Sequence, residues 1–270
     1  YYVDQTPAIC ETGRGSPTGA VLYQHNQFPK SYQGAMFFAD WSEGRILMLQ
    51  AKAQGASYVG QAETFLKGRP LNVVDLAVGL DGGLYFCTGG RGTKGGVYRV
   101  SSTAGKAVEP LVVEPLAEAS AIARAIHHPQ PMAAWARQEI AQLKIELGDQ
   151  WGTGIEAVAN DKTEAVEDRI RAMQLMVFFG PTPSDEMLIQ LSEDEDDLVR
   201  GQVARLCGLK EGRNIETLLG NLLADPSSAV RRKQLTFDIL LKVKTVIVWL
   251  YFNPSEVQHF AKRSSALLMA

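Results

Sequence analysis

The chain is poor in the residues that build metal and redox centres, with 3 cysteines and 4 histidines among its 270 residues. Cys10, Cys87 and Cys207 are odd in number and far apart, so free thiols are expected rather than a disulfide framework. No C-x-x-C pair is present. This excludes a zinc ribbon, a thioredoxin motif and a c-type haem attachment within this sequence.

The chain also lacks an excess of positive charge and a long apolar run. Its formal net charge is −3, from 27 basic and 30 acidic side chains, which argues against a nucleic-acid surface as its main role. The longest apolar run, Val246 to Phe252, is far shorter than the roughly 20 residues that span a bilayer. No leader-like segment follows Tyr1, so we expect a mature, trimmed or fragmentary chain.

Residues 1–104 contain short runs of β-branched and aromatic residues separated by turn residues, which predicts β-strands. The runs are Ala20 to Tyr23, Ala35 to Ala39, Arg45 to Leu49, Asp75 to Val78, Gly83 to Cys87 and Gly96 to Val100. Asp81-Gly82 is typical of a hairpin turn. Gly34 to Phe38 recurs 48 residues later as Gly82 to Phe86. Short strands that repeat at about 50 residues are typical of propeller blades.

We therefore predict a partial β-propeller of about two blades, all-β, over residues 1–104. Two blades do not close a ring. Either earlier blades are missing or the β-unit is an open sandwich, and we favour missing blades.

Residues 131–233 show helical spacing of apolar residues and are predicted to form an α-helical, HEAT-like solenoid. The predicted helices are Met132 to Leu147, Ala165 to Phe179, Asp185 to Leu191, Leu198 to Gly208, Ile215 to Leu223 and a last one from Ser228 onward. Ser184 is the expected N-cap of the third. Val199-Arg200 recurs 31 residues later as Val230-Arg231, each after an acidic residue. In such repeats the acid begins the helix, the Val packs between helices and the Arg bridges to the next repeat.

Two further segments complete the predicted domain organisation. Residues 105–130 are predicted to be a linker, because a run of small and polar residues near 101–106 leads into Pro110 and Pro115. Residues 234–270 are rich in β-branched and aromatic residues and depart from the repeat pattern. We interpret them as an atypical C-terminal tail, or as a sequence that has lost its natural continuation.

Several motifs of the first 100 residues resemble a known family. They are Thr12 to Gly19, Gly34 to Trp41, Asp75 to Val78 and, most specifically, Gly89 to Val100. With these motifs the chain resembles the closing blades of bacterial proteins related to glucose/sorbosone dehydrogenases. It is more similar still to the exported "membrane-bound dehydrogenase" or haem-binding-domain proteins. In that family a propeller is followed by HEAT-like repeats and a cytochrome c module.

The resemblance implies a periplasmic or exported location and, in the full-length family, a quinone cofactor like pyrroloquinoline quinone, calcium and haem c. The chain departs from the family in two ways. It lacks the earlier blades, where the family's catalytic base and most cofactor contacts lie, and it lacks a C-x-x-C-H motif.

The predicted cofactor- or ligand-binding residues are Arg14, Trp41, Arg91 and Lys94. Arg91 and Lys94 lie in the glycine-rich loop Gly89 to Gly96, and they would hold the carboxylate of a quinone cofactor or of an acidic sugar. The flat ring of Trp41 would stack on a sugar or a quinone, and Arg14 would pair with an anionic ligand. The alternatives are structural: a loop whose glycines take positive φ, a turn before the first strand, and a tryptophan packed between blades.

Other polar residues favour structural interpretations. Asp75 and Asp81 are weak calcium candidates, and Asp81 is better explained as a turn residue. His25 has no carboxylate neighbour in the sequence and is interpreted as a surface histidine. His127-His128 is interpreted as part of a loop, and the acids from Glu193 to Asp197 as a solvated turn. No catalytic residue and no metal ligand is predicted.

Two functional hypotheses follow. In the first, the chain is a fragment of an exported quinone-type sugar or alcohol dehydrogenase coupled to an electron-transfer haem module, and it is inactive alone because it shows no base. In the second, the chain is a non-catalytic scaffold. It would bind a protein partner on the solenoid face, or a sugar or polysaccharide, but no nucleic acid.

Overall fold

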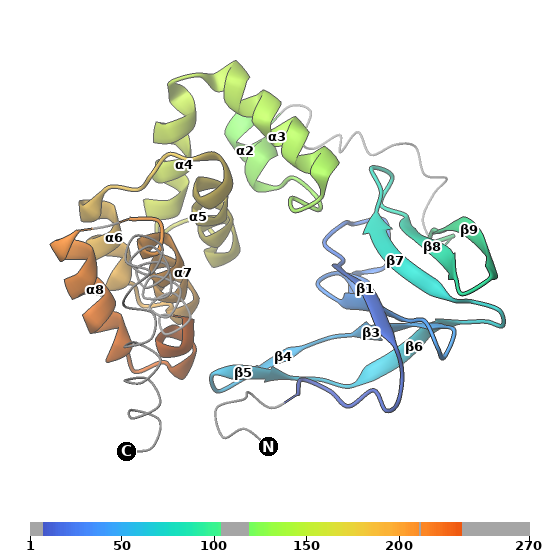
Figure 1. Cartoon of the computed structure of the whole chain (residues 1–270). Helices are drawn as coiled ribbons and strands as arrows, with labels where there is room; N and C mark the ends of the chain where they lie inside the picture. Colours follow the sequence, from blue (N-terminus) through green and yellow to red (C-terminus); the bar gives the residue numbers. More distant parts are fainter. Residues whose placement is uncertain (1–7, 104–118, 211, 234–270) are drawn as a thin grey trace, which may run out of the picture. The chain divides into compact units, whose positions relative to one another are not determined.

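The computed structural model describes residues 8–103, 119–210 and 212–233. Internal contacts divide the chain into two compact units, Tyr1–Pro181 and Thr182–Ala270. Among the described residues, the strands and the helices α2 to α5 belong to the first unit, and α6 to α8 belong to the second (Figure 1). The predicted tail, 234–270, and residues 105–118 of the predicted linker lie outside the described residues.

The strands of the described residues form three small antiparallel sheets (Figure 1). The four-stranded sheet has the order β1 (Pro17–Leu22), β2 (Met36–Asp40), β3 (Arg45–Leu49), β6 (Ala62–Lys67). The three-stranded sheet has the order β7 (Val73–Val78), β8 (Leu84–Gly90), β9 (Thr93–Val100). A small hairpin pairs β4 (Lys52–Gln54) with β5 (Ser57–Val59).

The two larger sheets share an aromatic core. In β2, Phe37 and Ala39 are fully buried while Phe38 between them is only partly buried, which is the alternation expected of a strand with one face on a core. Tyr23 stacks on Phe28 with 4.7 Å between the ring centroids. The Tyr23 hydroxyl donates to the carbonyl of Gly82 at 2.8 Å, and burial raises its pKa to about 12. Strand β1 contacts β7, so this core ties the sheets together.

The predicted fold class, a partial β-propeller followed by a HEAT-like solenoid, is wrong. No sheet of the described residues closes into a propeller or a barrel, and open antiparallel sheets followed by helices form a small α/β fold instead. Gly34 to Phe38 leads into β2 of one sheet, whereas Gly82 to Phe86 leads into β8 of another. The physical reason is that alternating apolar residues require only one opposing apolar face. The two sheets supply that face to each other, so the pattern does not specify a ring.

Four helices follow the sheets in the described part of the first unit. They are α2 (Ala121–Ile126), α3 (Ala134–Leu147), α4 (Gln150–Asn160) and α5 (Val166–Phe179). The positions of α3 and α5 confirm two predicted helices. Helix α2 falls inside the predicted linker, and α4 was not predicted because its two glycines hide a buried stripe. Trp151, Ile155 and Ala159 form that stripe at a four-residue spacing.

Two side chains attach the segment before and at the start of α3 to the strands. Gln130 Nε2 donates to the carbonyl of Leu22 at 2.6 Å, and its Oε1 accepts the backbone N–H of Gln24 at 2.8 Å. Trp135 Nε1 donates to the carbonyl of Val78 at 3.0 Å. Gln130 is buried, so these bonds satisfy the polar atoms of its own side chain, which are removed from water.

The second unit contains α6 (Asp185–Ser192), α7 (Asp197–Cys207) and α8 (Arg213–Leu223) among its described residues. The hydroxyl of Ser184 accepts the N–H of Met187 at 3.1 Å, which confirms the predicted N-cap of α6. Asp196, one of the acids predicted to be a solvated turn, caps α7 in the same way. Over the described ranges, no helix is long and apolar enough to cross a membrane.

Candidate functional site

The structure brings Trp41 and Arg91 together. Arg91 and Gly92 have φ values of +50° and +77° and connect the paired residues Gly90 and Thr93, so they form the two-residue turn of the β8–β9 hairpin. Arginine is an unusual residue at positive φ, where Asn, Asp or Gly is preferred. Its guanidinium carbon lies 5.3 Å from the centroid of the Trp41 ring, which is cation–π geometry. This contact offsets part of the backbone cost.

A ring of hydrogen bonds fixes the Trp41 side of this pair. Trp41 Nε1 donates to the carbonyl of Gly89 at 2.7 Å, and its backbone N–H donates to the carbonyl of Ser16 at 2.9 Å. Asn72 closes the ring, because its side chain donates to the carbonyl of Trp41 at 3.0 Å and its own carbonyl accepts the N–H of Gly89 at 3.0 Å. Strand ends from both larger sheets therefore position the indole.

The other two predicted residues, Arg14 and Lys94, are exposed. Arg14 lies two residues before Ser16, whose carbonyl accepts the N–H of Trp41, and Lys94 lies on β9 just after the hairpin turn. Within the described residues neither side chain has a hydrogen bond or ion pair, and no contact joins either one to Arg91. The nearby Asp40 is neutralised, because Arg45 pairs with it at 3.0 Å. We name Trp41, Arg91 and these two flanking cations the hairpin-tip site.

The two weak calcium candidates, Asp75 and Asp81, each make local structural contacts. Asp81 is a turn residue: its Oδ1 accepts the N–H of Gly83 at 3.0 Å and its Oδ2 pairs with Arg99 at 2.6 Å. Asp75 Oδ1 accepts the N–H of the next residue, at the other end of β7. In the described ranges no group of three or more His, Cys, Asp or Glu side chains is arranged to hold a metal ion. Burial raises the pKa of the Cys207 thiol to about 12.

The interpretation of His25 as a surface residue is wrong, because its exposed fraction is 0%. Its Nδ1 accepts the backbone N–H of Gln27 at 3.2 Å, so the neutral ring carries its proton on Nε2. That Nε2 is buried without a hydrogen-bond partner among the described residues. Burial lowers the pKa of His25, and His128 acts in the same direction, whereas the Leu80 carbonyl and Asp81 oppose the shift.

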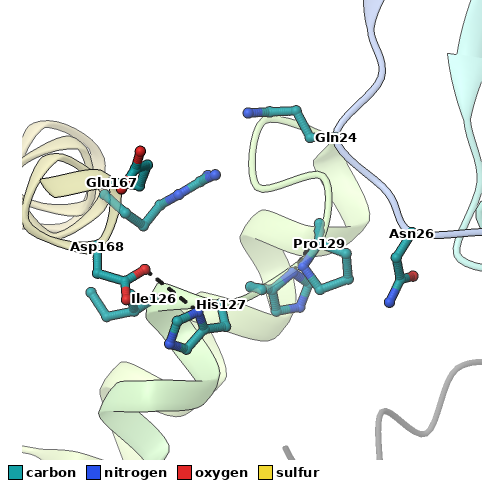
Figure 2. Close-up of a pocket in the computed structure, with 9 residues that line it drawn as sticks. Gln24, Asn26, Ile126, His127, Pro129, Glu167 and Asp168 are labelled. Atoms are coloured by element: carbon teal, nitrogen blue, oxygen red, sulfur yellow. Dashed lines mark hydrogen bonds and ion pairs between the residues drawn. The ribbon is translucent and has the colours of Figure 1, made fainter. Parts of the chain in front are cut away.

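The sequence analysis did not identify a pocket of about 240 Å³ in the first unit (Figure 2). It is lined by Gln24, Asn26, Ile126, His127, His128, Pro129, Glu167, Asp168 and Arg171. We name it the α2–α5 pocket. Figure 2 shows His127 turned toward Asp168, with 3.5 Å between Nδ1 and Oδ1. The only sequence signal was His127-His128 next to a proline, and the acids on α5 lie about 40 residues away in the chain.

The histidines of the α2–α5 pocket are already engaged, but Arg171 is not. His128 contacts the carbonyl of Pro129 through Nδ1 and the Glu139 carboxylate through Nε2, both at 2.8 Å. Within the described residues the guanidinium of Arg171 has neither a hydrogen bond nor an ion pair. Burial lowers the pKa of Arg171, and the nearby Asp168 carboxylate opposes this shift. Removing a guanidinium from water without a partner is costly.

Comparisons of the chain with protein-family models, curated proteins and solved structures found no match. The hairpin-tip site and the α2–α5 pocket must therefore be interpreted from their own chemistry.

Proposed function

We propose that this protein is a non-catalytic scaffold that binds an acidic polysaccharide at the hairpin-tip site. The observation that carries the proposal is the Arg91 guanidinium, held at positive φ over the fixed ring of Trp41. A guanidinium presents its donors in a planar fork that matches a carboxylate. The carboxylate of a uronic acid is the group in a polysaccharide that this fork suits.

Pre-organisation supports the proposal. Both the turn and the ring are positioned before any ligand arrives, so little side-chain entropy remains to be lost on binding. No described side chain donates to or accepts from the Arg91 guanidinium, which leaves its N–H groups available. Arg14 and Lys94 add positive charge in neighbouring segments, which favours a polyanion over a single small anion.

The experiment compares polygalacturonate with the same polymer in its methyl-esterified form, by isothermal titration calorimetry on the full chain. Esterification replaces each carboxylate with an uncharged methyl ester, so we expect binding of polygalacturonate alone, weakening as salt is added. Arg91→Gly should weaken it by roughly 10-fold, because it removes a charge-assisted hydrogen bond. Glycine suits the turn, so this variant keeps the fold.

The matched control is Lys52→Ala, which removes an exposed cation from β4, beyond the end of β3 that lies opposite the Trp41 turn. It should bind like the unchanged chain. Equal binding of the two polymers, or full binding by Arg91→Gly, would refute the proposal. The dehydrogenase activity, haem partner and exported location implied by the family resemblance stay predictions. Dye reduction by sugars, with a quinone cofactor and calcium added, tests the activity in the same preparation.

A further inference from the structure

The α2–α5 pocket presents both signs of charge on one helix. Glu167, Asp168 and Arg171 all lie on α5, with the acids in its first turn and the arginine one turn later. Side chains three and four residues apart on a helix are neighbours, with about 5–6 Å between their Cβ atoms. Nevertheless, Arg171 forms no ion pair with either acid within the described residues. Two carboxylates and one unpaired guanidinium therefore face the same small space.

The size of the pocket limits what it can hold. Its volume of about 240 Å³ is below the range of about 300–1,000 Å³ typical of drug-sized ligands. A nucleotide or an oligosaccharide does not fit, whereas a single amino acid does. Ile126 and Pro129 supply apolar lining, and Gln24 and Asn26 border the pocket from the segment that follows β1 (Figure 2).

We propose that the α2–α5 pocket binds a free α-amino acid as a zwitterion. The carboxylate of the ligand pairs with Arg171, and its ammonium group lies between Glu167 and Asp168. An apolar side chain of the ligand contacts Ile126 and Pro129. This site is separate from the hairpin-tip site and does not depend on the proposed function.

The charge arrangement selects a zwitterion over simpler ligands. A plain carboxylate would gain the guanidinium of Arg171 but would be repelled by the carboxylates of Glu167 and Asp168, the second of which contacts His127 at 3.5 Å. A plain amine would gain those carboxylates but would leave Arg171 without a partner. A ligand that carries both charged groups on one carbon, as an α-amino acid does, can satisfy all three side chains. Burial, which lowers the pKa of Arg171, makes the guanidinium more dependent on such a partner.

The test titrates the full chain with three ligands of matched shape: L-leucine, 4-methylpentanoate, which lacks the ammonium group, and 3-methylbutylamine, which lacks the carboxylate. We expect leucine to bind, and each analogue to bind at least about 10-fold more weakly, the effect of losing one charge-assisted hydrogen bond. Calorimetry gives the affinities. This comparison uses the unchanged protein, so it does not depend on whether a variant folds.

Variants locate the site. Arg171→Ala should weaken leucine binding by roughly 10- to 100-fold and Glu167→Gln by about 10-fold. The matched controls are Arg124→Ala on α2 and Glu164→Gln just before α5, because neither residue lines the pocket. Absence of leucine binding at millimolar concentration, equal binding of 4-methylpentanoate, or unchanged binding by a folded Arg171→Ala would each overturn the proposal. Polygalacturonate binding is measured separately, so the failure of one proposal is distinguishable from the failure of the other.

Discussion

Two regions of the molecule contain a sequence repeat, the helical segment 194–233 and the strands of residues 34–100. The repeated residues make equivalent contacts in the first region but not in the second. In the helical segment the repeat is also a repeat of contacts. Arg200 Nη1 donates to the carbonyls six and five residues before it, those of Asp194 and Glu195. Arg231 Nη1 donates to the two equivalent carbonyls, those of Asp225 and Pro226.

In the sheets the repeated residues do not make repeated contacts. Phe37 in β2 pairs with Met48 of β3, inside the four-stranded sheet, and it is fully buried among aromatic rings. Its counterpart Tyr85 in β8 pairs with Ala77 of β7 and is only partly buried, with its hydroxyl donating to Asp81. Contacts between residues five or six positions apart recur wherever the local sequence recurs. Contacts between strands depend on which strands meet, so a repeated strand sequence does not guarantee a repeated environment.

The largest expected effect is a loss of stability that is confined to the sheets. Phe37→Ala removes a fully buried ring from the aromatic core and should lower the free energy of unfolding of the sheets by about 4 kcal/mol. Hydrogen exchange measured by mass spectrometry should show lost protection in peptides from β2, β3 and β7. Peptides from α7 and α8 should keep their protection, because these helices belong to the other compact unit of the chain.

Val97→Ala is the control for that variant, since the Val97 side chain is 77% exposed and should contribute less than about 0.5 kcal/mol. Loss of protection in α7 and α8 of Phe37→Ala would show that the two regions unfold as one body.

The second prediction separates the two copies of the helical repeat. Arg200 also pairs with the buried Asp225, with Nε to Oδ2 at 2.7 Å and Nη2 to Oδ1 at 3.1 Å. Arg200→Ala leaves that carboxylate without its partner and should cost about 3 kcal/mol. Arg231→Ala loses only the carbonyl contacts and should cost about 1 kcal/mol. Guanidinium titration followed by far-ultraviolet circular dichroism measures the free energy of unfolding of both variants. Equal losses would mean that the ion pair between Arg200 and Asp225 does not contribute to stability.

The third prediction concerns pH, which should affect the two regions in different ranges. Burial lowers the pKa of His25, so the unfolded chain binds more protons than the folded chain below the ordinary value of about 6.5. The stability of the sheets should therefore be complete above that value and decrease as pH falls through it. The loss should level off below the folded-state pKa. Protonation would also place a hydrogen on Nδ1, where the Gln27 N–H now donates.

The region 182–233 contains no histidine. The hydrogen bonds from Arg200 lower the pKa of Asp225, so this region should lose stability only as pH falls below about 4. Hydrogen exchange at about pH 7 and about pH 5.5, corrected for intrinsic rates, distinguishes the two ranges. His25→Gln should remove the pH dependence of the sheets between those values, and His127→Gln should retain it. If the stability of the sheets still depends on pH in His25→Gln, another titrating group causes that dependence.

The smallest expected effect separates backbone strain from charge at the hairpin tip. Arg91→Gly removes the backbone cost of positive φ but also removes the contact with Trp41. Each contributes about 1 kcal/mol to the free energy of unfolding, with opposite signs, so the net change should be small. Arg91→Ala keeps the strain and loses the contact, so it should be about 1 kcal/mol less stable than Arg91→Gly. Thermal unfolding measures the difference. Equal stability of the two variants would show that the turn is not strained.

Most regular elements could be predicted from the sequence, because their signals are local. Alternation located β2, β3, β7, β8 and β9, and helical spacing located α3 and α5 to α8. Strands β4, β5 and β6 and helices α2 and α4 were missed. Strand β6 presents several exposed polar side chains, and α4 carries Gly152 and Gly154 just after its buried Trp151. In both, pairing or packing with other elements overrides weak intrinsic propensity.

The candidate sites were predicted less completely. A glycine-rich basic loop and a tryptophan were visible as separate motifs, but their contact, the guanidinium of Arg91 over the Trp41 ring, joins residues 50 positions apart. His25 was misinterpreted because residues far away in the sequence lie next to it, among them Gly82 and Trp135, whose ring centroid is 6.4 Å away on a helix more than 100 residues later. The α2–α5 pocket combines three segments, none of which has a motif of its own.

The sequence by itself determined most strands and helices, the Ser184 cap of α6 and the Val-Arg repeat of the second unit, because each rests on interactions between residues within a few positions. Only the tertiary structure decided that the sheets stay open, that Arg91 covers Trp41, and that an unpaired Arg171 faces two carboxylates in a pocket. The physical reason is that an alternating apolar pattern predicts which face of a strand is buried, but it does not predict which other element packs against that face. The partner is chosen by long-range packing, and the chemistry of a site follows from that choice.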